Sequence, residues 1–207
     1  MAEVNPDPPS DELIERVAAL MRHAAARAIL PVFRRLDAAD VREKAPGEVV
    51  TVADRQAEEI LAAGLRRLRP GSVVIGEEGV ADDPALLDQL RRAGEVWLVD
   101  PLDGTANFAA GQEPFAVMVA LCWDGVTEAS WILDPVRDSV AVARAGGGAY
   151  VDGEPVRTPS AAVPVESLRG VLATRFLPSE LRDAMRAGER RIGVVLPGHH
   201  CAGREYP

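Results

Sequence analysis

The feature that most constrains this chain is a short apolar run that leads into two acidic residues. The run at 96–99 is followed directly by Asp100-Pro101-Leu102-Asp103-Gly104-Thr105. A short apolar run bounded by turn residues is typical of a buried strand, so we expect a rigid strand to deliver Asp100. Pro101 restricts the backbone between the two acids. Gly104 permits a sharp turn and lets its own N–H come close to a ligand.

This arrangement predicts a cation site. Asp100, Asp103 and the Leu102 carbonyl would converge on one point, where the two carboxylates repel each other unless a cation lies between them. Hard oxygen ligands of this kind suit Mg²⁺. Glu77 and Glu78 follow another strand-like run and are flanked by glycines. We expect this loop to complete the coordination of one ion or to bridge to a second.

Each of these features also has a plain structural explanation when it is taken alone. An Asp-Gly pair after a strand is more often just a turn, and a Glu pair in a loop is usually solvated surface. Asp54 fits a capping box that begins at Thr51. The metal site is favoured because the acids occur together, in order, and each at the end of a strand.

Composition excludes several classes of function and partner. The formal net charge of −9 argues against a nucleic acid polymer or an anionic membrane as partner. Two cysteines, Cys122 and Cys201, are too few for a disulfide framework and fit a reducing compartment. The N-terminus has no basic region leading into an apolar run, and no apolar stretch approaches the roughly 18–20 residues that span a bilayer. We therefore expect a cytoplasmic protein.

Helical and strand-like patterns alternate along the chain, which predicts an α/β fold. Helices are expected from Ser10 to about Pro31 and at 53–68, 84–92 and 178–187, and strands at 48–52, 72–75, 96–99, 115–123, 129–133, 139–142 and 168–173. Residues 1–9 are expected to form a disordered lead. A segment rich in Pro, Ser and Ala, 158–164, favours a division into an N-terminal α+β portion at 10–160, which carries the metal-binding loops, and a smaller C-terminal portion at 161–207.

Two motifs make the chain resemble the inositol monophosphatase family. Gly76-Glu77-Glu78 looks like the family's Gly-Glu-Glu motif, and 97–108 looks like its signature Asp-Pro-(apolar)-Asp-Gly-Thr-x-Asn-Phe. The resemblance runs from about residue 10 to the C-terminus. It implies a layered αβαβα sandwich and a lithium-sensitive phosphatase that uses two or three Mg²⁺ ions, with Mn²⁺ as a substitute. It also implies a homodimer.

The resemblance further implies a role for each matching residue. The metal ligands would be Glu77, Asp100, the Leu102 carbonyl and Asp103, with Glu78 supporting them. Thr105 and Asp54 would orient and deprotonate the attacking water, and Glu77 would join them as a catalytic residue. The substrate phosphate would be bound at Gly104, Thr105, Asp103 and Lys44.

Three departures from the family pattern carry expectations of their own. Gly79 stands where Ser or Thr often follows the Glu pair, which removes a possible hydroxyl group. Ala106 stands where Thr is common, and this second difference bears on substrate choice. The family's later Trp-Asp motif, whose Asp binds the second metal, does not appear; residues 200–206 resemble the helix start just upstream of it. We therefore expect an incomplete C-terminal portion, and weak or no turnover with one tight metal site rather than two for residues 1–207 alone.

The leading functional hypothesis is Mg²⁺-dependent hydrolysis of an inositol or sugar monophosphate by direct attack of water. Histidinol phosphate, fructose 1,6-bisphosphate and 3′-phosphoadenosine phosphates remain alternative substrates, since relatives serve all of them. Haloacid-dehalogenase-type phosphatases also use an Asp…Asp-Gly-Thr element, but their two carboxylates are two residues apart, whereas Asp100 and Asp103 are three apart. A catalytically incomplete phosphate- or metal-binding protein is the non-enzymatic alternative.

Overall fold

The computed structural model describes residues 8–45, 48–91, 94–158, 163–174 and 177–206. The predicted disordered lead at 1–9 lies almost wholly outside these residues. The chain divides into two compact units: Met1–Val156 together with Cys201–Pro207, and Arg157–His200. The end of the chain returns to the first unit through a short helix. The sequence predicted a boundary between residues 160 and 161, and in the structure the first unit ends at Val156.

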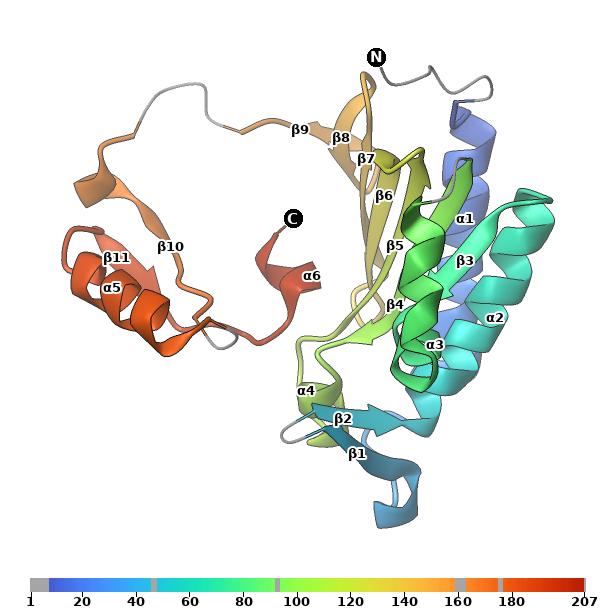
Figure 1. Ribbon diagram of the computed structural model, residues 1–207, viewed down its shortest axis with the longest axis horizontal. Coiled ribbons are helices and arrows are strands. Elements are labelled where there is room, and N and C mark those ends of the chain that lie inside the picture. Colours follow the sequence, from blue (N-terminus) through green and yellow to red (C-terminus); the bar gives the residue numbers. More distant parts are fainter. Residues whose placement is uncertain (1–7, 46–47, 92–93, 159–162, 175–176, 207) are drawn as a thin grey trace. The chain divides into compact units, whose positions relative to one another are not determined.

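A seven-stranded mixed sheet organises the first unit, in the order β3-β4-β5-β6-β7-β8-β9 (Figure 1). Its strands are β3 (Val73–Gly76), β4 (Glu95–Asp103), β5 (Ala116–Trp123), β6 (Val126–Asp134), β7 (Ser139–Arg144), β8 (Gly148–Val151) and β9 (Glu154–Val156). Strands β3 and β4 are parallel, and all later pairs are antiparallel. Helices pack on the sheet, so the predicted α/β class is confirmed.

Two long helices cover one face of this sheet (Figure 1). Helix α1 (Asp11–Ala24) begins at Ser10, whose Oγ accepts the Leu13 N–H at 3.2 Å, and it continues as a π-helical turn, η1 (Ala25–Ile29). Helix α2 (Val52–Leu68) begins at the predicted capping box of Thr51. Each helix thus starts where a side-chain oxygen satisfies an N–H group that has no partner within the helix.

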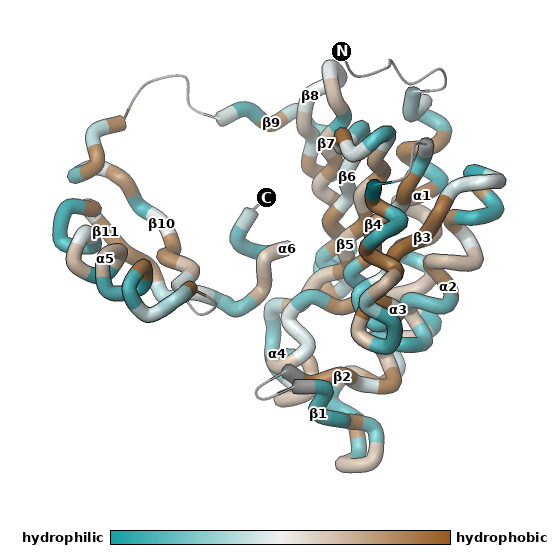
Figure 2. Tube along the Cα trace, in the orientation of Figure 1, coloured by the Kyte–Doolittle hydropathy of each residue, from teal (hydrophilic) through white to brown (hydrophobic). Residues whose placement is uncertain are grey.

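The two faces of the sheet are buried to different degrees. Toward α1 and α2, alternate strand residues such as Trp97, Leu121 and Trp131 are completely buried, and the two indole rings lie 5.9 Å apart. On the opposite face, Leu98 and Met118 are only partly buried. Figure 2 shows the hydrophobic colouring that runs along the central strands. The main core therefore lies between the sheet and the two long helices.

The short elements of this unit were expected only in part: β2 (Glu48–Thr51) and the 3₁₀ helix η3 (Pro84–Arg91) correspond to the strand predicted at 48–52 and the helix predicted at 84–92. Strand β1 (Val41–Ala45) pairs antiparallel with β2 to form a hairpin. The predicted loop at Glu77-Glu78 is wrong, because these residues open a short helix, α3 (Glu77–Asp82). The remaining short elements of this unit are the 3₁₀ helix η2 (Ala38–Asp40) and the helices α4 (Thr105–Ala109) and α6 (Ala202–Glu205).

The second unit is small. Strand β10 (Arg169–Val171) pairs in parallel with β11 (Val194–Leu196), and helix α5 (Ser179–Glu189) lies between them in the sequence. A 3₁₀ turn, η4 (Val165–Ser167), precedes β10. Over both units, none of the helices in the described ranges is both long and apolar enough to traverse a bilayer.

Candidate metal centre

A β-bulge in β4 brings the two aspartates of the signature to the same face of the sheet. Asp100 pairs with Met118 and Asp103 pairs with Ala116, so two residues of β4 oppose one residue of β5. Side chains three positions apart in a regular strand point to opposite faces. The extra residue in the bulge cancels this alternation. Asp100 and Asp103 therefore both lie on the face away from α1 and α2.

The first turn of α3 lies next to these aspartates. Gly76, the last residue of β3, pairs in parallel with Val99, so Glu77 continues the chain beside Asp100. Burial, together with the nearby carboxylates of Glu77 and Asp103, raises the pKa of Asp100 to about 8. One hydrogen bond opposes this rise, from the Leu102 N–H to Asp100 Oδ1 at 3.1 Å. The predicted acids thus come together at a point where their negative charges disfavour one another.

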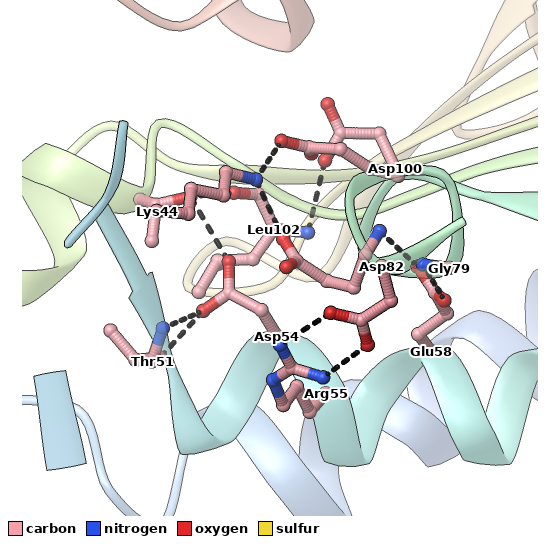
Figure 3. A network of polar contacts seen from close by, with 12 residues as sticks. Lys44, Thr51, Asp54, Arg55, Glu58, Gly79, Asp82, Asp100 and Leu102 are labelled. Carbon is pink, nitrogen blue, oxygen red and sulfur yellow. Dashed lines mark hydrogen bonds and ion pairs between the residues drawn. The ribbon is translucent and has the colours of Figure 1, made fainter. Parts of the chain in front are cut away.

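Lys44 of the β1–β2 hairpin provides positive charge at this point (Figure 3). Its Nζ lies 2.5 Å from Glu77 Oε1 and 2.9 Å from Glu78 Oε1. Burial lowers the pKa of Lys44, but the hydrogen bonds and charges of the two glutamates outweigh burial and hold it above its ordinary value. Lys44 was predicted as a substrate-binding residue. In the structure it contacts two of the predicted metal ligands.

The donors at this point suit a hard cation. Glu78 is buried, and its second carboxylate oxygen, Oε2, has no hydrogen-bond partner. A buried anionic oxygen without a partner is costly unless a cation binds it. As they stand, the described residues contain no group of three or more His, Cys, Asp or Glu side chains arranged to hold a metal ion. Coordination would therefore require the side chains around Lys44 to rearrange.

A second cluster joins α2 to the turn after β4. Asp54 Oδ2 accepts the N–H of Thr51 at 2.8 Å and the Thr51 hydroxyl at 2.6 Å, and its Oδ1 lies 3.0 Å from Thr105 Oγ1 (Figure 3). The Thr105 hydroxyl also lies 2.8 Å from the Leu102 carbonyl oxygen. Burial raises the pKa of Asp54 to about 6, against the hydrogen bonds from both threonines. Asp54 therefore has the capping role that the sequence predicted, and it also contacts Thr105, the other residue expected to act on the attacking water.

The turn after β4 is anchored to the end of the chain. Gly104 has a φ of 85°, which lies in the left-handed region that favours glycine. A Cβ at this residue would also lie 2.9 Å from the Pro114 carbonyl oxygen. The Gly203 N–H of α6 donates to Asp103 Oδ2 at 2.7 Å, and Cys201 is buried beside Asp103. The backbone of the signature is thus held from both sides.

Sequence reasoning missed Glu58. Its carboxylate accepts the N–H groups of Glu78 at 2.8 Å and Gly79 at 2.9 Å. Its spacing from Asp54 was the available signal, because residues four apart lie on the same face of a helix. The face of α2 that carries Asp54 and Glu58 is directed toward the predicted metal ligands.

The match to known proteins is consistent with this geometry. The sequence profile described as "Inositol monophosphatase family" matches residues 11–192. The chain belongs to the inositol monophosphatase family. The chain is 36% identical over 159 residues to the inositol-1-monophosphatase of Mycobacterium leprae, covering 76% of this chain and 53% of the relative. It is 35% identical over 166 residues to the Nus factor SuhB of Pseudomonas aeruginosa, covering 78% of this chain and 57% of the relative.

Solved structures show the same fold. Inositol monophosphatase II of Staphylococcus aureus superposes with a TM-score of 0.74 at 25% identity, covering 94% of this chain and 68% of that one. The inositol monophosphatase of Thermotoga maritima gives a TM-score of 0.72 at 22% identity, covering 89% and 67%. The chain thus spans between about half and two thirds of the length of these members of the family.

Proposed function

We propose that this protein hydrolyses a small phosphate monoester in a Mg²⁺-dependent reaction. The observation that carries the proposal is the bulge in β4, which places Asp100 and Asp103 on one face of the sheet beside Glu77. The raised pKa of Asp100 supports it, because a bound cation would relieve the repulsion among these carboxylates. The inositol-1-monophosphatases among the relatives support the reaction class.

The residues proposed to hold Mg²⁺ are Glu77, Asp100, the Leu102 carbonyl and Asp103, with Glu78 next to them. When bound, Mg²⁺ supplies Lewis-acid stabilisation of the charge that develops on the phosphoryl oxygens. For Glu77 and Glu78 to act as ligands, Lys44 Nζ has to leave the position between them. The same proposal includes two or three ions in total, with Mn²⁺ as a substitute for Mg²⁺.

Asp54 and Thr105 are proposed to position and deprotonate the attacking water. The Thr105 hydroxyl carries one proton but lies within hydrogen-bond distance of two acceptors, Asp54 Oδ1 and the Leu102 carbonyl. Thr105 can therefore pass a proton to Asp54 while its oxygen accepts one from water. A carboxylate with a pKa of about 6 is suited to a general base near neutral pH.

The substrate side of the proposal is a small phosphorylated metabolite. The N–H groups of Gly104 and Thr105, at the start of α4, would bind its phosphate. Lys44 and the cation held by Asp103 would contribute positive charge. Inositol monophosphate or a related sugar phosphate is the first candidate. Histidinol phosphate, fructose 1,6-bisphosphate and 3′-phosphoadenosine phosphates are the other candidates within the family. A homodimer in the cytoplasm is likewise proposed.

Phosphate release tests the proposal. Inositol monophosphate and the other esters are incubated with the protein in Mg²⁺ and, separately, in EDTA. We expect Mg²⁺-dependent release, which Asp100→Asn lowers by at least roughly 10³-fold. Asp88→Asn, which changes an exposed aspartate of η3 in the same way, should leave the rate unchanged. Full activity in EDTA, or near-normal turnover by Asp100→Asn, would contradict the proposal.

Metal binding without hydrolysis would favour the other hypothesis, a catalytically incomplete phosphate- or metal-binding protein. The same assay separates the two hypotheses when metal binding is measured alongside it.

A further inference from the structure

Glu58 joins α2 to the first turn of α3. Helix α3 begins at Gly76, which has no side chain to cap the helix. The first N–H groups of a helix have no partner within it and need an acceptor from elsewhere. Glu58 supplies this acceptor from α2: its Oε2 accepts the Glu78 N–H at 2.8 Å and its Oε1 accepts the Gly79 N–H at 2.9 Å. The carboxylate thus replaces the missing cap.

The glycine at position 76 fits this contact. A Cβ on Gly76 would lie 2.2 Å from Glu58 Cδ and 2.3 Å from its Oε2, which is closer than any real contact. Any larger residue at position 76 would push the carboxylate away from the two N–H groups. The glycine of the Gly-Glu-Glu motif thus leaves the room that Glu58 needs to reach these N–H groups.

The two hydrogen bonds fix the backbone that carries Glu77 and Glu78. The bonded N–H groups belong to Glu78 and Gly79, so they hold the peptide units directly after Glu77. Helix α3 has only six residues, too few to be stable by itself. Its conformation, and the direction of its two glutamates, therefore depend on contacts such as this one.

We propose that Glu58 is a positioning residue that holds the Glu77-Glu78 turn in the geometry needed to bind the cation. The inference rests on the proposed function, because it takes Glu77 as a metal ligand. Residues that orient metal ligands typically change metal affinity about 10–100-fold when they are mutated. Glu58 acts through the backbone of the turn and need not touch the ion.

Glu58→Gln is the sharpest test. Glutamine keeps the shape of the side chain but replaces one acceptor oxygen by an NH₂ group, which would face a backbone N–H donor. The matched control is Glu59→Gln on the same helix, where the side chain is exposed. Mn²⁺ binding to the protein is measured by electron paramagnetic resonance, with unfolding in EDTA recorded for each variant.

We expect Glu58→Gln to weaken Mn²⁺ binding by at least about tenfold and Glu59→Gln to leave it unchanged. Wild-type affinity in a folded Glu58→Gln protein would overturn the inference. If the wild-type protein binds no Mn²⁺, the proposed function fails instead, so the two failures are distinguishable.

Amide hydrogen exchange in the metal-free wild-type protein tests the contact without any variant. We expect the Glu78 and Gly79 amides to be protected, because both are hydrogen-bonded to Glu58. In Glu58→Gln, at least one of them should exchange faster, while the amides of α1 stay as they were. Unprotected exchange of both amides in the wild-type protein would also overturn the inference, even if the variant fails to fold.

Discussion

Replacing Asp54 by asparagine should lower activity and, at the same time, stabilise the metal-free fold at alkaline pH. The Asp54 side chain is completely buried, and burial raises its pKa from 3.8 to about 6. A carboxyl group with a raised pKa binds its proton more tightly in the folded state than in the unfolded state. Its contribution to stability is therefore complete below about pH 4 and is lost as the pH rises through about 6. Asparagine does not ionise and avoids this loss.

The size of the effect follows from the pKa. Because the pKa rises from 3.8 to about 6, ionised Asp54 lowers the free energy of unfolding by up to about 3 kcal/mol at alkaline pH, at roughly 1.4 kcal/mol per pKa unit. Asparagine can keep the remaining contacts: its oxygen can accept from Thr51, and its NH₂ group can donate to Thr105, whose proton then goes to Leu102. Loss of a negative charge in the first turn of α2 costs about 0.3–1 kcal/mol. Near pH 8, the free energy of unfolding of the Asp54→Asn protein should therefore exceed that of the wild type by about 2 kcal/mol.

The assay is urea unfolding of the wild-type and Asp54→Asn proteins in EDTA over a pH series, with turnover measured in Mg²⁺. The difference in unfolding free energy should grow in favour of the variant between about pH 4 and pH 8. Turnover should fall on the order of 10²–10⁴-fold, as for the loss of a general base. A pH-independent difference in stability would refute the reasoning about burial. Turnover near the wild-type value would refute the role in catalysis.

Two further substitutions test the surroundings of the site. Lys44→Met should tighten Mg²⁺ binding by calorimetry, by a factor on the order of ten, because Lys44 competes with the cation for Glu77 and Glu78; weaker binding would show that Lys44 assists the cation. Gly203→Ala should destabilise the fold by about 1–3 kcal/mol in thermal unfolding, because the new Cβ would lie 2.5 Å from the Cβ of Ala116. An unchanged melting temperature would contradict that packing.

The parts of the fold that depend on local signals could be predicted from the sequence. The starts of α1 at Ser10 and of α2 at Thr51 were predicted because a capping side chain acts within three residues of its partner. The buried strand at 96–99 was predicted because its apolar run is short and bounded. The resemblance to a family then supplied roles that local patterns alone did not.

The features that decide the site depend on pairing over long distances. The bulge between Asp100 and Asp103 exists only in the register with β5, so the sequence spacing alone could not place both acids on one face. Helix α3 was expected to be a loop because six residues that include Gly79 carry too little helical preference, and its cap comes from Glu58, about twenty residues earlier. Local patterns contain no signal for such contacts.

Calorimetric titration of the protein with Mg²⁺ at neutral pH tests the central claim most directly, because the claim is that the carboxylates around Asp100 form a cation site. We predict binding that Asp100→Asn abolishes and that Asp88→Asn preserves, with protons released as the cation replaces the proton favoured by the raised pKa of Asp100. No heat of binding to the wild-type protein, or equal binding to the Asp100→Asn protein, would contradict the account.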